Sequence, residues 1–159
     1  RSKSYTSEEV LGAVASLHLG LEFPDSRFAD FASAGEALLI ADNACAYKFM
    51  MGAAITHNWR EMDLSAHQTN AIVTRKKDEA SSHYLEGGHY EGVGANVLGC
   101  PRIALTWLVN ELSGLNITLK KEEIVTTGTT TTPMAILPGD KIEADFGYLG
   151  KISAHLSEI

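Results

Sequence analysis

The chain has 159 residues, 45% of them hydrophobic and 21% charged, which is the size and balance of one globular domain with its own core. Its net charge of −7 and its lack of a basic run longer than residues 75–77 argue against binding to nucleic acid, and no apolar run approaches the ~20 residues of a membrane helix. Cys45 and Cys100 have no zinc-ligand spacing, so we expect two reduced, mostly buried thiols in a cytoplasmic protein. We expect no membrane partner.

The first part of the chain predicts a capped helix and then a strand with two different faces. Residues 6–9 (TSEE) form a capping box, in which a threonine caps the helix and a glutamate three residues later reaches back to it. The apolar spacing extends this helix to about residue 16. Over residues 17–22 the period changes to two, which places leucines on one face and Glu22 on the other. Pro24 is expected to end this strand.

The rest of the chain predicts a strand-rich fold with two further helices. The longer helix starts at Pro101, carries an apolar stripe and stops at Gly114. Residues 81–99 are rich in Gly, His and Tyr and are expected to form a long loop, which in compact domains is often functional. The other expected elements are a short helix over residues 35–44, a polar loop over 58–65, and strands over 46–51, 70–75, 123–127, 141–146 and 151–156.

The strand with two faces leads into an acid-rich turn and an arginine, over residues 21–27 (LEFPDSR). Mg²⁺ takes oxygen donors, so Glu22 is a candidate ligand for a hard divalent cation. One carboxylate cannot hold this ion alone, and partners would have to come from elsewhere. The alternative is a solvated Glu22 that pairs with Arg27. The residues by themselves leave both interpretations open.

Two further segments could bind a ligand. Residues 124–133 (IVTTGTTTTP) lead from a strand into a glycine and a run of hydroxyls, where N–H and hydroxyl groups could bind a carboxylate without adding charge. The alternative is a loop that contains threonine for its β propensity. Residues 87–96 (GGHYEGVGAN) lack the spacing of a dinucleotide-binding loop, so we interpret them as a surface loop or lid. The sequence contains no nucleophile elbow (Gly-x-Ser-x-Gly), so it does not predict an acyl-transfer triad.

Several segments, taken in order, resemble one family. Together they are similar to the C-terminal half of 2-keto-4-pentenoate hydratases and 4-oxalocrotonate decarboxylases, over about residues 7–156. The resemblance implies the α+β mixed β-sandwich roll of the fumarylacetoacetate hydrolase superfamily, with a few short helices outside, as a single C-terminal catalytic domain over residues 1–159. The segments are residues 21–27, 41–44 (ADNA), 99–101 (GCP), 104–108 (ALTWL), 124–128 (IVTTG) and 138–147 (PGDKIEADFG).

The resemblance also implies a metal site and its substrate contacts. The family binds Mg²⁺ or Mn²⁺ through three carboxylates, and Glu22 matches the third. The first two belong to a Glu-x-Glu motif upstream of the capped helix. The lysine that the family places near the substrate also lies upstream. This sequence begins too late to contain either. The remaining wall would consist of Arg27, Thr127, Gly128 and Thr129 as substrate contacts, with the catalytic residue unknown.

The function implied is that of a hydratase-like lyase of aromatic catabolism. A 2-hydroxy-2,4-dienoate would chelate the metal, form a conjugated 2-oxo acid and add water at its far end. A 2-oxo acid decarboxylase or a C–C hydrolase of the superfamily would use the same electron sink. The alternatives are a non-catalytic assembly subunit and a repurposed, metal-free enzyme. Unpaired strand edges further predict a homo-oligomer, or association with a chain that carries the missing half.

Overall fold

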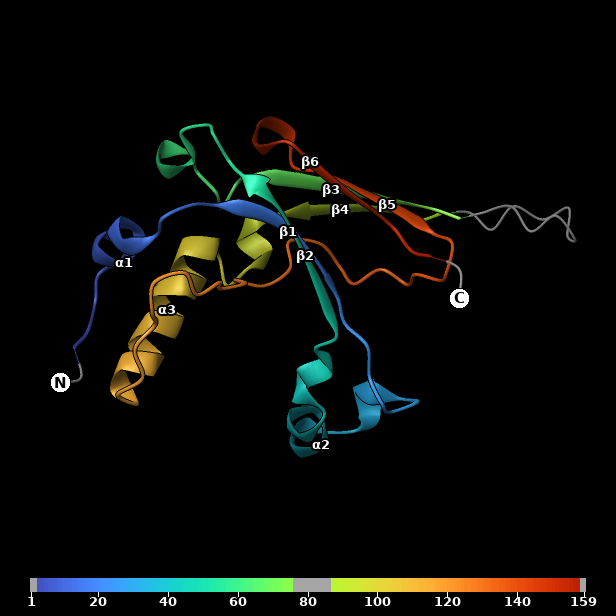
Figure 1. Ribbon diagram of the computed structural model, residues 1–159, viewed down its shortest axis with the longest axis horizontal. Helices are drawn as coiled ribbons and strands as arrows, with labels where there is room; N and C mark the ends of the chain where they lie inside the picture. Colours follow the sequence, from blue (N-terminus) through green and yellow to red (C-terminus); the bar gives the residue numbers. More distant parts are fainter. Residues whose placement is uncertain (1–2, 76–86, 158–159) are drawn as a thin grey trace, which may run out of the picture.

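The computed structural model describes residues 3–75 and 87–157, and in this part of the chain two antiparallel sheets are accompanied by helices (Figure 1). None of the helices described there has the length and apolar character to cross a membrane. The helices are α1 (Ser7–Ala13), α2 (Glu36–Ala41) and α3 (Pro101–Gly114). The strands are β1 (His18–Phe23), β2 (Lys48–Ala54), β3 (Gln68–Thr74), β4 (His89–Val93), β5 (Lys141–Asp145) and β6 (Lys151–His155).

Helix α1 begins with the predicted capping box and lies beside α3 (Figure 1). The Glu9 N–H donates to the Thr6 hydroxyl at 3.2 Å, and the Glu9 carboxylate accepts from the Thr6 N–H at 2.9 Å. The backbone of Tyr5 also exchanges two hydrogen bonds with the side chain of Asn110 on α3, at 2.7 and 3.1 Å. These contacts fix the entry of β1 relative to the longest helix.

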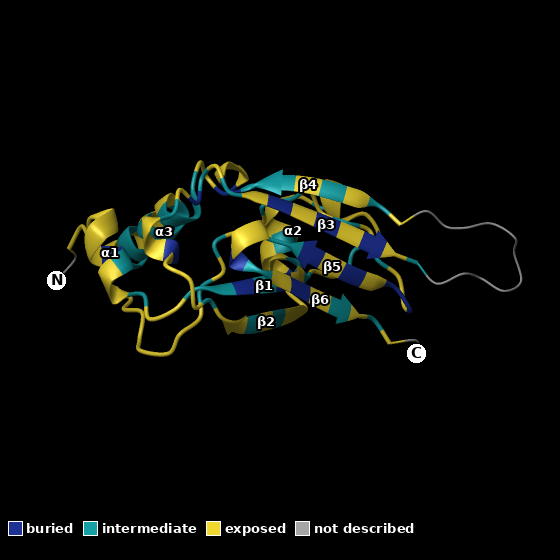
Figure 2. Ribbon diagram, turned by 90° about the horizontal axis from the view of Figure 1, so that it is seen from above, coloured by how far each residue is buried: buried dark blue, intermediate teal, exposed yellow. Residues whose placement is uncertain are grey.

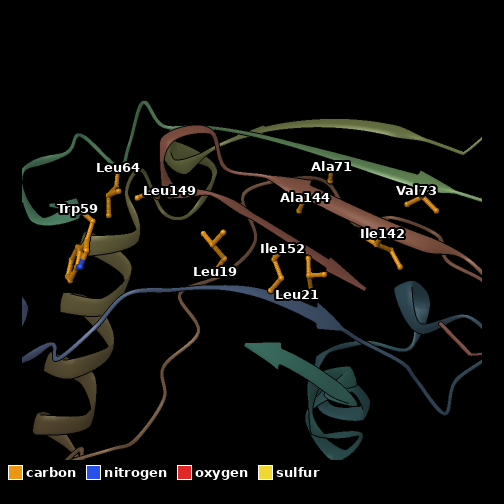
Figure 3. Packing of buried hydrophobic residues seen from close by; sticks show 10 residues of the cluster. All are labelled: Leu19, Leu21, Trp59, Leu64, Ala71, Val73, Ile142, Ala144, Leu149 and Ile152. Carbon is orange, nitrogen blue, oxygen red and sulfur yellow. The ribbon is translucent and has the colours of Figure 1, made fainter. Parts of the chain in front are cut away.

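The two sheets pack face to face around the core. One sheet has the order β4-β3-β5-β6, and the other consists of β1 and β2. Figure 2 shows buried and exposed residues alternating along β3 and β5, as expected for strands with one buried face. Leu19 and Leu21 of β1 point toward Ile142 and Ile152 of the larger sheet (Figure 3). The α+β class expected from the sequence is confirmed.

Two sequence predictions about secondary structure were wrong. Residues 123–127 form no strand; Ile124 is 63% exposed, so the apolar alternation there has no buried face to occupy. Part of the expected long loop, residues 89–93, is strand β4, which pairs with β3. Gly92 of β4 leaves room for the carbonyl of Thr130, with which a side chain would collide. Residues 81–86 of that expected loop lie outside the described ranges.

Arg102, near the start of α3, ties the helix to the turn before β3. Its Nη2 lies 2.9 Å from the carbonyl oxygens of Trp59 and Arg60 and 2.8 Å from that of Met62. This nitrogen carries two hydrogens, so the three carbonyls share them. The contact orients Trp59, which is buried in the core.

We expect Arg102→Met to lower the free energy of unfolding by about 2–3 kcal/mol, because the part-buried carbonyls of Trp59 and Met62 and the exposed carbonyl of Arg60 lose a charged donor. Arg102→Lys keeps the charge but lacks the planar fork, so its stability should lie between those of the wild type and Arg102→Met. Urea denaturation followed by tryptophan fluorescence measures both changes. An Arg102→Met protein as stable as the wild type would show that these bonds contribute nothing net.

Candidate functional site

A groove of ≈ 1560 Å³ runs along β1, bordered by α1, α3 and residues 116–134. Glu22 lines it, and so do Thr127, Gly128 and Thr129. Four of the five predicted site residues therefore line one groove, although they come from opposite ends of the chain. Arg27 is not among the residues that line it.

Glu22 occupies the outer face of the β1–β2 sheet. Its neighbour Leu21 is buried against the larger sheet, and the alternation of the strand turns Glu22 to the opposite side, where it is exposed. In the antiparallel register Glu22 stands directly across from Phe49 of β2. Among the described residues its carboxylate makes no ion pair and no hydrogen bond to protein. It is thus available to a ligand in the groove.

Hydrogen bonds attach the threonine-rich segment, residues 124–133, to residues 93–96 at the end of β4. The carbonyl of Thr130 accepts the Val93 N–H at 3.1 Å and the Asn96 side-chain amide at 2.7 Å. The Thr129 hydroxyl donates to the Thr131 carbonyl at 2.9 Å, so its proton is used within the loop. Thr127 is half-buried and lines the groove.

Gly128 adopts a backbone conformation that side chains rarely allow. Its φ is +118°, and an added Cβ would stand 3.4 Å from Cγ1 of Val97. The absence of a side chain lets the backbone turn between Thr127 and Thr129. The glycine in the predicted carboxylate-binding segment is therefore required by the backbone geometry.

Arg27 makes a different contact from the one considered for it. Its guanidinium pairs with the buried carboxylate of Asp42, at the end of α2, and not with Glu22. The Arg27 N–H and the Ser26 hydroxyl donate to the same carboxylate, at 3.1 and 2.8 Å. The Arg27 side chain is 82% exposed. It fixes the turn after β1 to α2, and its role as a substrate contact stays a prediction.

The pKa of Asp42 lies below its ordinary value of 3.8, first because the Ser26 hydroxyl donates to it and then because Arg27 does. A carboxylate whose pKa is lowered by folding stabilises the fold above its unfolded pKa, and this contribution is lost as the pH falls through the folded pKa. We therefore expect Asp42→Asn to be less stable than the wild type at pH 6. The difference should shrink below about pH 3.8. Urea midpoints of both proteins, measured between about pH 2.5 and pH 6, give this stability difference. A difference that does not depend on pH would contradict a lowered pKa of Asp42.

The described residues do not form a complete metal site. Over residues 3–75 and 87–157, no group of three or more His, Cys, Asp or Glu is arranged to hold a metal ion. Glu22 supplies one oxygen donor, whereas Mg²⁺ requires near-octahedral coordination. Cys45 and Cys100 are free thiols, and each is half-buried, whereas the sequence led us to expect mostly buried side chains.

Sequence reasoning did not identify the apolar neighbours of Glu22. Phe49 and Met51 of β2 share its face and line the groove. The period-two pattern of β1 predicted where Glu22 points, but the partner across the strand depends on the pairing register. No signal in the sequence fixes that register, because residues 24–47 connect the strands instead of a tight turn.

The comparisons with known proteins find hydratases and decarboxylases. The chain is 29% identical over 147 residues to a 2-keto-4-pentenoate hydratase of Paraburkholderia xenovorans, and 29% identical over 146 residues to a 4-oxalocrotonate decarboxylase of Pseudomonas putida. Each match covers 92% of this chain and 50% of the relative. The chain thus spans about half the length of the curated relatives it matches. No protein-family model matches it.

A solved structure shows the same fold. The 4-oxalocrotonate decarboxylase from Pseudomonas putida G7, complexed with magnesium and adipate, matches with a TM-score of 0.73 at 25% identity, over 94% of this chain and 52% of that one. The resemblance to hydratases and decarboxylases of this type is confirmed, and so is the fold that it implied.

Proposed function

We propose that this homologue of 2-keto-4-pentenoate hydratases and 4-oxalocrotonate decarboxylases supplies one wall of a hydratase-like lyase site. Its substrate would be a 2-hydroxy-2,4-dienoate or a related 2-oxo acid from aromatic catabolism. The main support is that Glu22 and the segment from Thr127 to Thr129, far apart in the sequence, line one groove. Residues 1–159 would act as the C-terminal catalytic domain of the family.

We further propose Mg²⁺ or Mn²⁺ as the cofactor, with Glu22 as one ligand. The structural relative was solved with magnesium and a dicarboxylate, which supports a divalent ion beside a carboxylate compound. When bound, such an ion polarises the substrate oxygens as a Lewis acid. The described residues do not complete its coordination, so the other ligands would come from the half of the relatives' length that this chain does not cover.

The chain's own contribution would be to bind and orient the acid. The backbone N–H groups around Gly128 and the hydroxyl of Thr127 are donors that can hold a carboxylate in the groove. Thr129 would act by holding the loop in shape, since its proton is bonded to Thr131. These contacts suit hydration, decarboxylation and C–C cleavage equally, because all three reactions begin from the same bound keto-enol acid.

Surface area supports a partner. The accessible area is 11308 Å², whereas a compact monomer of 17.1 kDa exposes about 7750 Å². The fifteen residues outside the described ranges account for at most about 2400 Å² as fully exposed chain. The remaining excess, about 1100 Å², is larger than the ~800 Å² that each partner buries in a standard interface. We propose a homo-oligomer, or association with a chain that carries the other half, in the cytoplasm.

The test is an assay of the whole protein with Mg²⁺ or Mn²⁺. Loss of the dienoate absorbance of 2-hydroxypenta-2,4-dienoate would support the hydratase, and release of CO₂ from 4-oxalocrotonate would favour the decarboxylase, the activity of the solved relative. Failure to convert any keto-enol acid with metal supplied would contradict the proposal. It would leave the non-catalytic or metal-free relative as the explanation for the retained fold.

A further inference from the structure

We propose that Phe49 and Met51 form an apolar wall that selects the hydrocarbon end of the substrate. This inference rests on the proposed function, since it takes Glu22 as marking the end of the groove where the acid group binds. It adds a substrate class: acids whose far end is an alkyl or aryl group and not a second carboxylate.

The strand register places these side chains next to Glu22. Glu22 stands across from Phe49, and Gly20 stands across from Met51. Residues directly opposite in an antiparallel pair share a face, with Cβ atoms about 4.5–5.5 Å apart. All four residues line the groove. The outer face of the β1–β2 sheet therefore holds one carboxylate with two large apolar side chains beside it.

Gly20 leaves the space that the Phe49 ring occupies. A Cβ at Gly20 would lie 2.7 Å from Cζ and 2.8 Å from Cε2 of Phe49, closer than real Cβ atoms approach. The ring thus covers the bare backbone of β1, immediately before the position of Glu22 along that face. A side chain at Gly20 would displace the ring, so the shape of the wall depends on this glycine.

The wall is open to the groove. Phe49 is 44% and Met51 43% exposed, while the leucines on the opposite face of β1 are buried in the core. Aromatic and thioether groups bind apolar surface and offer no donor to a carboxylate. The lysines that line the groove, Lys120 and Lys121, come from the segment after α3 and not from the β1–β2 sheet. An apolar substituent therefore fits against this wall, on the Gly20 and Met51 side of Glu22, better than a second acid group.

The first test compares substrates that differ only at the far end. The probes are 2-hydroxy-2,4-dienoates of five, six and seven carbons and the seven-carbon dioate, assayed with the whole protein and Mg²⁺ (chain lengths about one methylene apart). For the wild type, kcat/KM should rise about fourfold per added methylene and fall for the dioate. Phe49→Ala should reduce this rise to less than about twofold.

Phe31→Ala is the matched control, because Phe31 is also an exposed phenylalanine but does not line the groove. It should keep the wild-type dependence on chain length. The inference is overturned if Phe49→Ala lowers kcat/KM equally for all dienoates, or if the wild type prefers the dioate. If the wild type converts none of them, the proposed function fails instead, so the two failures are distinguishable.

A double-mutant cycle tests whether Gly20 acts through the Phe49 ring. Gly20→Ala should change the ratio of kcat/KM between the seven- and five-carbon substrates (~two methylenes) in the wild-type background, but not in the Phe49→Ala background, where no ring is displaced. An equal change in both backgrounds would show that Gly20 acts without the ring, and would overturn the dependence of the apolar wall on this glycine. Should Gly20→Ala fail to fold, Phe49→Leu, which shortens the wall without touching β1, provides the same comparison of the ratio.

Discussion

Replacing Glu22 with glutamine is expected to lower kcat of the whole protein by about 10²–10³-fold at a fixed Mg²⁺ concentration that just saturates the wild type, because the variant then loses most of the Lewis-acid contribution of a bound metal, which is worth several kcal/mol. The amide has the shape of the carboxylate but lacks its charge, and a neutral oxygen is a weak ligand for a hard cation. Glu22 is exposed and pairs with no described protein group. The free energy of unfolding should therefore change by less than about 0.5 kcal/mol.

Glu91→Gln is the matched control. Glu91 is exposed on β4, does not line the groove, and makes the same chemical change possible elsewhere. Calorimetric titration with Mg²⁺ and steady-state kinetics should show weaker metal binding for Glu22→Gln alone. Unchanged metal affinity and unchanged kcat in Glu22→Gln would remove Glu22 from the ligand set and, with it, the physical basis of the proposed metal site.

Elements with strong local signals were predictable from the sequence. The capping box fixes the start of α1 within one residue, since both of its hydrogen bonds are made by neighbours in the chain. Pro101 and Gly114 are the first and last residues of α3. The alternation of β1 predicted that Glu22 would point away from the leucine face. In each case residues close by in the sequence determine where the element begins or which way its side chains point.

Features set by distant partners were not predictable in the same way. Strand β4 lies in a glycine-rich segment, residues 87–94, and becomes a strand by pairing with β3. Residues 123–127 have strand-like composition but no paired neighbour in the described structure. The alternative pairing of Arg27 with Glu22 rested on their proximity in sequence. The buried carboxylate of Asp42, fifteen residues further on, takes Arg27 instead, because folding brings the end of α2 beside the turn after β1.

The site also depends on the packing of the two sheets, and Ile142→Ala tests that packing. Ile142 of β5 is 3% exposed and belongs to the cluster of buried residues between the sheets that also contains Leu21 (Figure 3). We expect the substitution to cost about 2–5 kcal/mol of unfolding free energy, the range for deleting buried isoleucine side chains. The matched control is Glu143→Ala on the exposed face of the same strand, whose ion pair with Lys151 is solvated and worth at most ~1 kcal/mol.

Urea denaturation measures both variants, and their comparison separates packing from strand propensity. Leu21 and Glu22 are consecutive residues on opposite faces of β1, and Leu21 belongs to the same buried cluster as Ile142, so a looser core loosens the strand that positions Glu22. Ile142→Ala should therefore also weaken Mg²⁺ binding at temperatures where it remains folded, while Glu143→Ala should not. Equal stability of the two variants would mean that the β1–β2 sheet does not depend on the larger sheet for its position, and that Glu22 is held in the groove by contacts other than the core.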